Sequence, residues 1–468
     1  MPAERRGAGK WIMERRDGRE DTDVAVPRSG AAKQTSEIRA RWAWVEPAVW
    51  TDRMLSALEK GVKGGVWFSL IDKVFRRANL ESAAGKVIAN KGAAGVDRVS
   101  VSQYARYRER YLDRLENALR DNTWVPKAIR RHYIPKADSA ELRPLGIPCV
   151  EDRVVQTALR NVLEPIFEHT FHENSFGFRP GRGCKDALRM ADESLRSGAL
   201  YVVDADLRKF FDTIPHETVL ERVREHVADS RVLALVERFL KQDVLDGMEQ
   251  WTPERGAPQG AVISPLLANI FLNPLDHLMA GHGHTMVRYA DDSVVLCRSK
   301  EEAEAALDLM ARWCEENGLE LHPDKTHIAD LNNAGEGFDF LGYRFQRTRG
   351  GALRHWAGEK ACKKVRTRLR PIVRRSNGHS MAKLIEELNP ILRGWFDYFK
   401  QSNRTSMQKM DGWLRMRLRS IKRQRSRRKG IGRGYDHIKW PNRHFAELGL
   451  YSLEQAWVNA RQSFRCNH

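Results

Sequence analysis

The sequence lacks the features of several common classes of protein. Its six cysteines are scattered, with no Cys-x-x-Cys pair and no Cys/His block at zinc-finger spacing, so neither a disulfide framework nor a zinc domain is expected. Cys297 and Cys314 lie in apolar stretches and are interpreted as small core residues. No apolar run approaches the ~20 residues of a membrane span, and the N-terminus has no apolar signal segment. These absences predict a cytoplasmic protein with no membrane partner.

Charge is what the sequence has in excess. Its 468 residues carry 80 Lys+Arg against 61 Asp+Glu, which gives a formal net charge of +19. Such a surplus is typical of proteins that neutralise the phosphates of a nucleic acid. The length is sufficient for two or three domains.

The order of predicted elements indicates an α+β fold. Residues 1–40 are basic and poor in apolar periodicity, and they are predicted to form a flexible arm. Short helices are expected from 42 to 121. Between about 124 and 345, β-prone runs alternate with amphipathic helices, and basic helices follow after about 350. The predicted strands are Ala128–Tyr133, Tyr201–Val203, Thr285–Val287 and Val294–Leu296.

Two groups of carboxylates stand where predicted strands end. Asp204 and Asp206 follow the β-prone run that begins at Tyr201, and Asp291 and Asp292 lie at the tip of a predicted hairpin. Adjacent carboxylates repel each other unless a cation lies between them, and carboxylate oxygens are the ligands that Mg²⁺ prefers. Two adjacent Asp residues can also simply favour a turn. The second acidic strand end strengthens the prediction of a metal site.

Ordered motifs resemble those of group II intron reverse transcriptase/maturases, over nearly the whole chain from about residue 65. Tyr289-Ala-Asp-Asp292 matches the signature of reverse transcriptases, and Asp206-Leu-Arg-Lys-Phe-Phe211 matches the family's first metal-binding motif. Supporting segments in the polymerase part are Arg143–Pro148, Ser175–Gly181, Gly256–Asn269, Leu321–Thr326 and Phe340–Arg344. Gly394–Phe399 resembles the maturase-specific domain.

The resemblance implies a right-hand polymerase with fingers, a palm built on an antiparallel sheet and a helical thumb, followed by a helical maturase domain. The expected limits are 41–125 for an N-terminal helical extension of the fingers, 126–347 for fingers and palm, 348–378 for the thumb and 379–468 for the RNA-binding maturase domain. The HNH nuclease domain that the family often carries is not expected in this sequence. The source of the priming 3′ end is therefore left open.

The same resemblance assigns roles to residues. Asp206 and Asp291, with the carbonyl of Leu207, would hold two Mg²⁺ ions, and Asp292 would support the catalytic set. Asp204 competes with Asp206, but only Asp206 has an aromatic residue five positions later. Nucleotide-binding residues would be Lys136 and Arg143 on the triphosphate, Phe211 as a steric gate against ribose, Gln259 beside the nucleotide and Lys325 as proton donor to pyrophosphate. Each of these could instead be an ordinary core or surface residue.

A basic run after residue 410 is the predicted contact with RNA. Its arginines alternate with apolar residues, so one side of a helix can pack while the other meets phosphate. A solvated surface is the alternative. The predicted RNA-binding residues are Arg415, Arg419, Arg423, Arg427 and Arg428.

The resemblance thus implies an RNA-directed DNA polymerase of bacterial type, associated with the nucleoid or a ribonucleoprotein. Its partners would be group II intron RNA, an RNA template with a DNA primer, dNTPs and target DNA. A splicing cofactor without polymerase activity, or a polymerase recruited to a defence or spacer-acquisition system, remain alternatives. The oligomeric state is not predicted.

Overall fold

A computed structural model describes residues 37–62, 64–135 and 142–466, and it describes the side chains as far as residue 462. The first 36 residues of the predicted arm lie outside this range. The chain then forms short helices, as expected, two of which meet at Tyr107. These first helices are α2 (Asp52–Lys60), α3 (Ile71–Val74), α4 (Arg77–Ala89), α5 (Val101–Arg106) and α6 (Arg108–Arg120).

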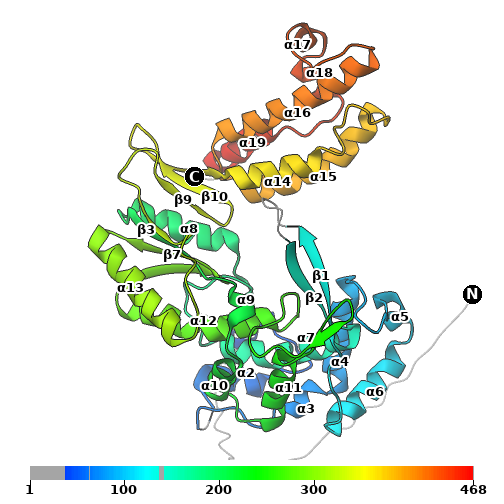
Figure 1. The fold of residues 1–468 in the computed structure, drawn as a ribbon, viewed down its shortest axis with the longest axis vertical. Coiled ribbons are helices and arrows are strands. Elements are labelled where there is room, and N and C mark those ends of the chain that lie inside the picture. Colours follow the sequence, from blue (N-terminus) through cyan, green and yellow to red (C-terminus); the bar gives the residue numbers. More distant parts are fainter. Residues whose placement is uncertain (1–36, 63, 136–141, 467–468) are drawn as a thin grey trace, which may run out of the picture.

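A first sheet has the strand order β2-β1-β4-β5. Its strands are β1 (Ile129–Pro135), β2 (Leu142–Ile147), β4 (Val244–Asp246) and β5 (Glu249–Trp251). The pair β1–β2 is antiparallel, whereas β1–β4 is parallel. The long helix α7 (Val150–Glu168) follows β2 and packs against α4, so this sheet and the N-terminal helices form one layered region (Figure 1).

Asp152, in the first turn of α7, is buried in this region. Its carboxylate accepts hydrogen bonds from the Lys127 amide at 3.3 Å and the Gln242 side chain at 3.1 Å. Burial raises the pKa of Asp152 to about 7, and the nearby charge of Glu151 acts in the same direction. The group is therefore largely protonated in the folded protein below neutral pH.

A second sheet, β6-β7-β3-β8, is antiparallel at every pairing. Its strands are β6 (Thr285–Tyr289), β7 (Asp292–Cys297), β3 (Tyr201–Asp206) and β8 (His327–Asp330), and the hairpin predicted around Asp291 is present. Alternate side chains serve two hydrophobic cores: Val203 and Val295 belong to one, and Val202 and Val294 to the other. Three helices pack against this sheet: α8 (Cys184–Arg196), α12 (Ser264–Gly281) and α13 (Lys300–Glu316). The short helix α9 (Phe210–Thr213) follows β3, and α10 (His216–Arg224) packs against α11 (Ser230–Leu240) and α12.

A third sheet and a helical unit complete the chain. The sheet has the order β11-β10-β9, from β9 (Gly337–Phe340), β10 (Tyr343–Arg347) and β11 (Leu353–Ala357). The helices α14 to α19 form a separate stack beyond β9 and β10 (Figure 1). They are α14 (Glu359–Leu369), α15 (Met381–Phe399), α16 (Arg404–Arg425), α17 (Tyr435–Lys439), α18 (Asn442–Glu447) and α19 (Leu453–Cys466). The mixed α+β fold with a helical C-terminal unit is as predicted. Within the described residues, no helix has the length and apolar character needed to cross a membrane.

Candidate active site

The register of the second sheet brings the predicted carboxylates together. Asp206, the last residue of β3, pairs with Asp292, the first residue of β7. Asp291 lies in the two-residue loop that joins β6 to β7, in which Ala290 has a φ of +60°. Because side chains alternate along a strand, Asp204 points to the same face as Asp206. Four carboxylates therefore gather at one end of the sheet.

These carboxylates disfavour one another's charge. Burial and, to a lesser extent, the charges of Asp204 and Asp291 together raise the pKa of Asp292 to about 7, although a hydrogen bond from the backbone of Leu341 acts in the opposite direction. Burial also raises the pKa of Asp204 to about 6. The pKa of Asp291 is raised by burial and by the charge of Asp206. A divalent cation among these oxygens would offset the cost of keeping the carboxylates charged and buried side by side, so the donor set fits a metal of the Mg²⁺ type.

Two cations approach the carboxylates from different elements. The Lys325 Nζ lies 2.6 Å from Asp206 Oδ2, and both side chains are partly exposed. Arg143, in β2, is exposed, and its charge lowers the pKa of Asp291. The predicted nucleotide-binding residues Lys325 and Arg143 thus lie beside the carboxylates. Lys136 is outside the described residues.

Phe211 and Gln259 line a common cavity of about 200 Å³. The segment that carries Gln259 is fastened on both sides: the Ala257 amide donates to the Phe211 carbonyl at 2.7 Å, and the Gln259 carbonyl accepts from the Gly146 amide at 2.7 Å. Gly260 has a φ of +105°, and a Cβ there would lie 2.4 Å from the Gly146 carbonyl oxygen. Only glycine permits this close approach between the segment and β2.

Leu207 directly follows Asp206 and forms an isolated antiparallel bridge with Leu321. The hydrogen bonds that flank this bridge use the Asp206 carbonyl, which accepts from His322, and the Arg208 amide, which donates to Glu320. The pairing therefore does not use the Leu207 carbonyl, which keeps it suitable as a metal ligand.

Sequence reasoning missed the group that supports the hairpin. Arg288 in β6 is 1% exposed, and its guanidinium forms a two-pronged ion pair with Asp276 of α12, with Nε to Oδ1 at 2.7 Å. The same guanidinium donates to the Ala290 carbonyl at 2.9 Å and to the Asn269 side chain at 3.0 Å. Ala290 immediately precedes Asp291, so this network holds the tip of the hairpin that carries Asp291.

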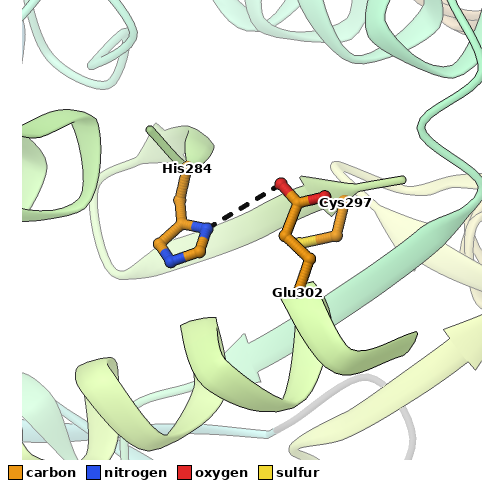
Figure 2. Close-up of side chains that lie close together, drawn as sticks. All are labelled: His284, Cys297 and Glu302. Atoms are coloured by element: carbon orange, nitrogen blue, oxygen red, sulfur yellow. Dashed lines mark ion pairs between the residues drawn. The ribbon is translucent and has the colours of Figure 1, made fainter. Parts of the chain in front are cut away.

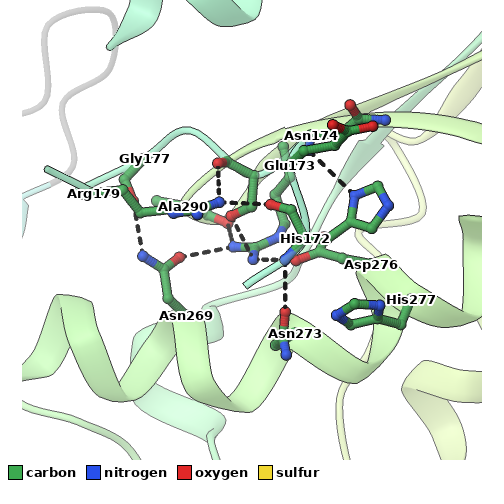
Figure 3. A network of polar contacts seen from close by, with 12 residues as sticks. His172, Glu173, Asn174, Gly177, Arg179, Asn269, Asn273, Asp276, His277 and Ala290 are labelled. Atoms are coloured by element: carbon green, nitrogen blue, oxygen red, sulfur yellow. Dashed lines mark hydrogen bonds and ion pairs between the residues drawn. The ribbon is translucent and has the colours of Figure 1, made fainter. Parts of the chain in front are cut away.

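Further contacts extend the network around Arg288. Asn269 Nδ2 donates to the Gly177 carbonyl at 2.8 Å (Figure 3). Ser175 Oγ accepts from Arg288 Nη2 at 2.9 Å. A Cβ on Gly177 would lie 2.3 Å from the Ala290 amide nitrogen. The available signal was an arginine inside the apolar run of β6, directly before the Tyr-Ala-Asp-Asp motif. Sequence reasoning also missed Arg131, which lines the cavity beside Phe211 and lies over the Trp251 ring.

The predicted RNA-binding arginines do not share one environment. Arg427 and Arg428 are exposed, and Arg423 is half-buried and paired with Asp436 at 2.7 Å. Arg415 is mostly buried beside Asp411 of the same helix.

Arg419 departs from the prediction. It is 2% exposed, donates to the Trp440 carbonyl at 2.9 Å and lies over the Phe445 ring. Its guanidinium therefore joins α16 to α18 and is not available to RNA.

Comparisons with known proteins agree with the motifs. Residues 134–345 match the family described as reverse transcriptase (RNA-dependent DNA polymerase), and residues 362–440 match the group II intron maturase-specific domain. Protein YkfC of Escherichia coli K12 is 31% identical over 351 residues, which cover 66% of this chain and 87% of YkfC. The group II intron-encoded protein LtrA of Lactococcus lactis is 38% identical over 170 residues, 36% of this chain and 28% of LtrA.

One chain of a solved partial Cas6-RT-Cas1–Cas2 complex is 23% identical, and the match covers 53% of this chain and 41% of that chain. Its TM-score of 0.35 is too low to bear on the fold. The reverse transcriptase match implies dependence on a divalent metal, and the two matches together imply binding of template and intron RNA. The chain belongs to the family of group II intron reverse transcriptase/maturases, and it is an RNA-directed DNA polymerase.

Proposed function

We propose that the protein copies intron RNA into DNA by two-metal nucleotidyl transfer, and that its C-terminal helices bind the folded intron during splicing and retrohoming. The observation that carries the polymerase part is the pairing of Asp206 with Asp292 beside Asp291. We also propose the domain limits. Residues 41–125 would form the N-terminal helical extension of the fingers, and residues 126–347 the fingers and palm. Residues 348–378 would form the thumb, and residues 379–468 the maturase domain.

The metal ligands would be Asp206, Asp291 and the Leu207 carbonyl, with Asp292 supporting them, and the metal would be Mg²⁺ as two ions. An all-oxygen donor set favours Mg²⁺ over softer metals. When bound, two such ions activate the primer 3′-hydroxyl and stabilise the charge on the departing pyrophosphate. Lys325 would deliver a proton from Nζ to that pyrophosphate, since its ammonium already lies at the Asp206 carboxylate.

The remaining roles concern recognition of the nucleotide. The guanidinium of Arg143 would hold triphosphate oxygens, together with Lys136. Phe211 would form the wall against a ribose 2′-hydroxyl, with Gln259 beside the base or sugar, because both line the same cavity. The exposed Arg427 and Arg428 would contact intron phosphates.

Primer extension on an RNA template with dNTPs and Mg²⁺ tests the proposal. The wild type should extend the primer, whereas Asp291→Ala/Asp292→Ala should give no product and still bind intron RNA. Asp308→Ala is the matched control, because Asp308 is an exposed carboxylate on α13. It should extend the primer like the wild type.

The splicing-cofactor alternative gives a different pattern. In that case wild-type protein would bind and assist intron RNA without extending a primer, and the palm substitutions would leave splicing unchanged. A double variant that still extends the primer would overturn the assignment of the carboxylates.

A further inference from the structure

Three potential metal ligands meet on the face of the second sheet opposite to the catalytic carboxylates. His284 directly precedes β6, Cys297 ends β7 and Glu302 lies in the first turn of α13 (Figure 2). The register that pairs Thr285 with Leu296 sets His284 opposite Cys297, at the end of the hairpin far from Asp291. One imidazole nitrogen, the thiol sulfur and one carboxylate oxygen all lie within 4.8 Å of one another.

The imidazole of His284 has a buried nitrogen that faces Glu302 without forming a hydrogen bond to it. Its Nδ1 is inaccessible to solvent and makes no hydrogen bond within the described part of the chain. The Glu302 Oε1 lies 3.9 Å away, beyond hydrogen-bond length. An unsatisfied buried polar atom costs about 1–3 kcal/mol, so native structures rarely keep one without a reason.

Glu302 presents one oxygen to this space. Its Oε2 accepts the Arg298 amide at 2.7 Å, while its own amide donates to Ser299 Oγ at 3.1 Å. This arrangement resembles an ordinary helix cap, which explains one carboxylate oxygen. It leaves unexplained why Oε1 is the oxygen that faces His284. A carboxylate oriented by a backbone hydrogen bond is typical of metal ligands.

Cys297 supplies a free thiol that lies in the hydrophobic core. It is fully buried and lies opposite Tyr201 of β3, so its position is fixed by pairing on that side. The His284 backbone is fixed as well, because its amide donates to the Met279 carbonyl at 2.9 Å. Three ligands thus come from three rigid segments, as a preorganised site requires.

We propose that His284 Nδ1, Cys297 Sγ and Glu302 Oε1 bind one divalent cation of the zinc class. Imidazole, thiolate and carboxylate are the ligands that zinc takes in proteins, with water free to complete a tetrahedron, whereas Mg²⁺ avoids sulfur. Ligand atoms around tetrahedral zinc lie roughly 3.3–3.6 Å apart given bonds of 2.0–2.3 Å. Side-chain shifts of about an ångström or less would close the present spacing around an ion. The thiol proton leaves to solvent on binding.

Bound metal would fasten both strands of the catalytic hairpin to α13. Since it binds on the opposite face and through sulfur, this site is independent of the Mg²⁺ ligands. The proposal therefore stands whether or not the polymerase mechanism does.

Co²⁺ is the probe, because thiolate-bound Co²⁺ absorbs in the near ultraviolet and tetrahedral Co²⁺ absorbs strongly in the visible. The full chain is loaded with Co²⁺ in excess Mg²⁺, which saturates the oxygen-only site, and then desalted. We expect one retained Co²⁺ per chain with the thiolate band. Cys297→Ala should lose the band, and Glu302→Gln should weaken Co²⁺ binding by on the order of 10-fold or more.

Cys314→Ala is the matched control, since Cys314 is equally buried, on α13 itself. It should keep the band, and so should Asp291→Asn/Asp292→Asn. Zn²⁺ should raise the melting temperature of the wild type and of Cys314→Ala but not of Cys297→Ala. Absence of a thiolate band in the wild type, or its survival in Cys297→Ala, would overturn the proposal.

Discussion

Replacing Asp276 by Asn tests whether the buried Arg288 holds the catalytic hairpin in position. The two side chains are only 2–3% exposed, and the carboxylate takes two of the guanidinium's hydrogen bonds. Breaking a buried ion pair by removing one charge costs about 3–5 kcal/mol, because the other charge stays buried without compensation. The Asn oxygen keeps one hydrogen bond, so we expect about 3 kcal/mol, at the lower end of that range.

Hydrogen exchange measures this loss where it acts. About 3 kcal/mol corresponds to a roughly hundredfold larger opening equilibrium, which should speed exchange of the amides of 285–297 by that factor. Primer extension should show a lower kcat with little change in the KM for dNTP, since the Ala290 anchor precedes Asp291 and does not contact the cavity at Phe211. Glu304→Gln is the control, because the exposed Lys300–Glu304 pair should contribute under about 1 kcal/mol.

A second variant separates charge from packing. Replacing both Arg288 and Asp276 by Met removes the pair without leaving an isolated charge, so it should cost less than the two single replacements added together. The hairpin should nevertheless exchange faster than in the wild type, since Ala290 has lost its donor. Unchanged exchange and unchanged kcat in Asp276→Asn would refute the reasoning.

Three further predictions address other parts of the chain. Phe211→Ala should raise the use of rNTPs relative to dNTPs by roughly tenfold or more in primer extension, and unchanged discrimination would remove Phe211 from the role of steric gate. Asp152→Asn should flatten the pH dependence of stability. Because the pKa of Asp152 is raised in the folded protein, the folded state holds an extra proton between about pH 4 and 7, and wild-type stability falls as pH rises through that window. An identical pH profile of melting temperatures in the variant would contradict this role of Asp152. Arg427→Ala/Arg428→Ala should weaken intron RNA binding and reduce its salt dependence by the amount expected for the loss of up to two phosphate contacts. Arg419→Ala should instead lower the melting temperature. A melting temperature equal to that of the wild type would contradict the packing role of Arg419.

The parts of the fold that could be predicted from sequence are those set by local patterns. The hairpin at Asp291 follows from the β-prone runs on either side of this residue, and in the structure the two-residue loop Ala290–Asp291 joins its strands. Asp206 and Asp292 come together because strand ends carry them and the two strands pair. Such predictions depend only on neighbouring residues along the chain and on the alternation of side chains in a sheet.

The parts that could not be predicted depend on distant partners. Arg288 reaches Asp276, Asn269 and Ser175, which are 12, 19 and 113 positions away, so no local pattern identifies them. Arg419 lies within a basic run that suggests an exposed surface, yet the adjacent Leu418 and Ser420 are buried and Trp440 supplies its acceptor. Whether a charge in such a run faces water is decided by the packing of α16 against α18.

The carboxylates of the candidate site are also linked to the C-terminal helices through one turn. Leu341, between β9 and β10, has a φ of +48°, and its backbone lowers the pKa of Asp292 by hydrogen bonding. The carbonyl of the same residue accepts the Tyr398 hydroxyl of α15 at 2.9 Å, and Tyr343 OH returns a bond to the Tyr398 carbonyl at 2.7 Å. Any movement of α15 when RNA binds must therefore act on the turn that contacts Asp292. Leu341 is thus the residue through which helix α15 reaches the environment of Asp292.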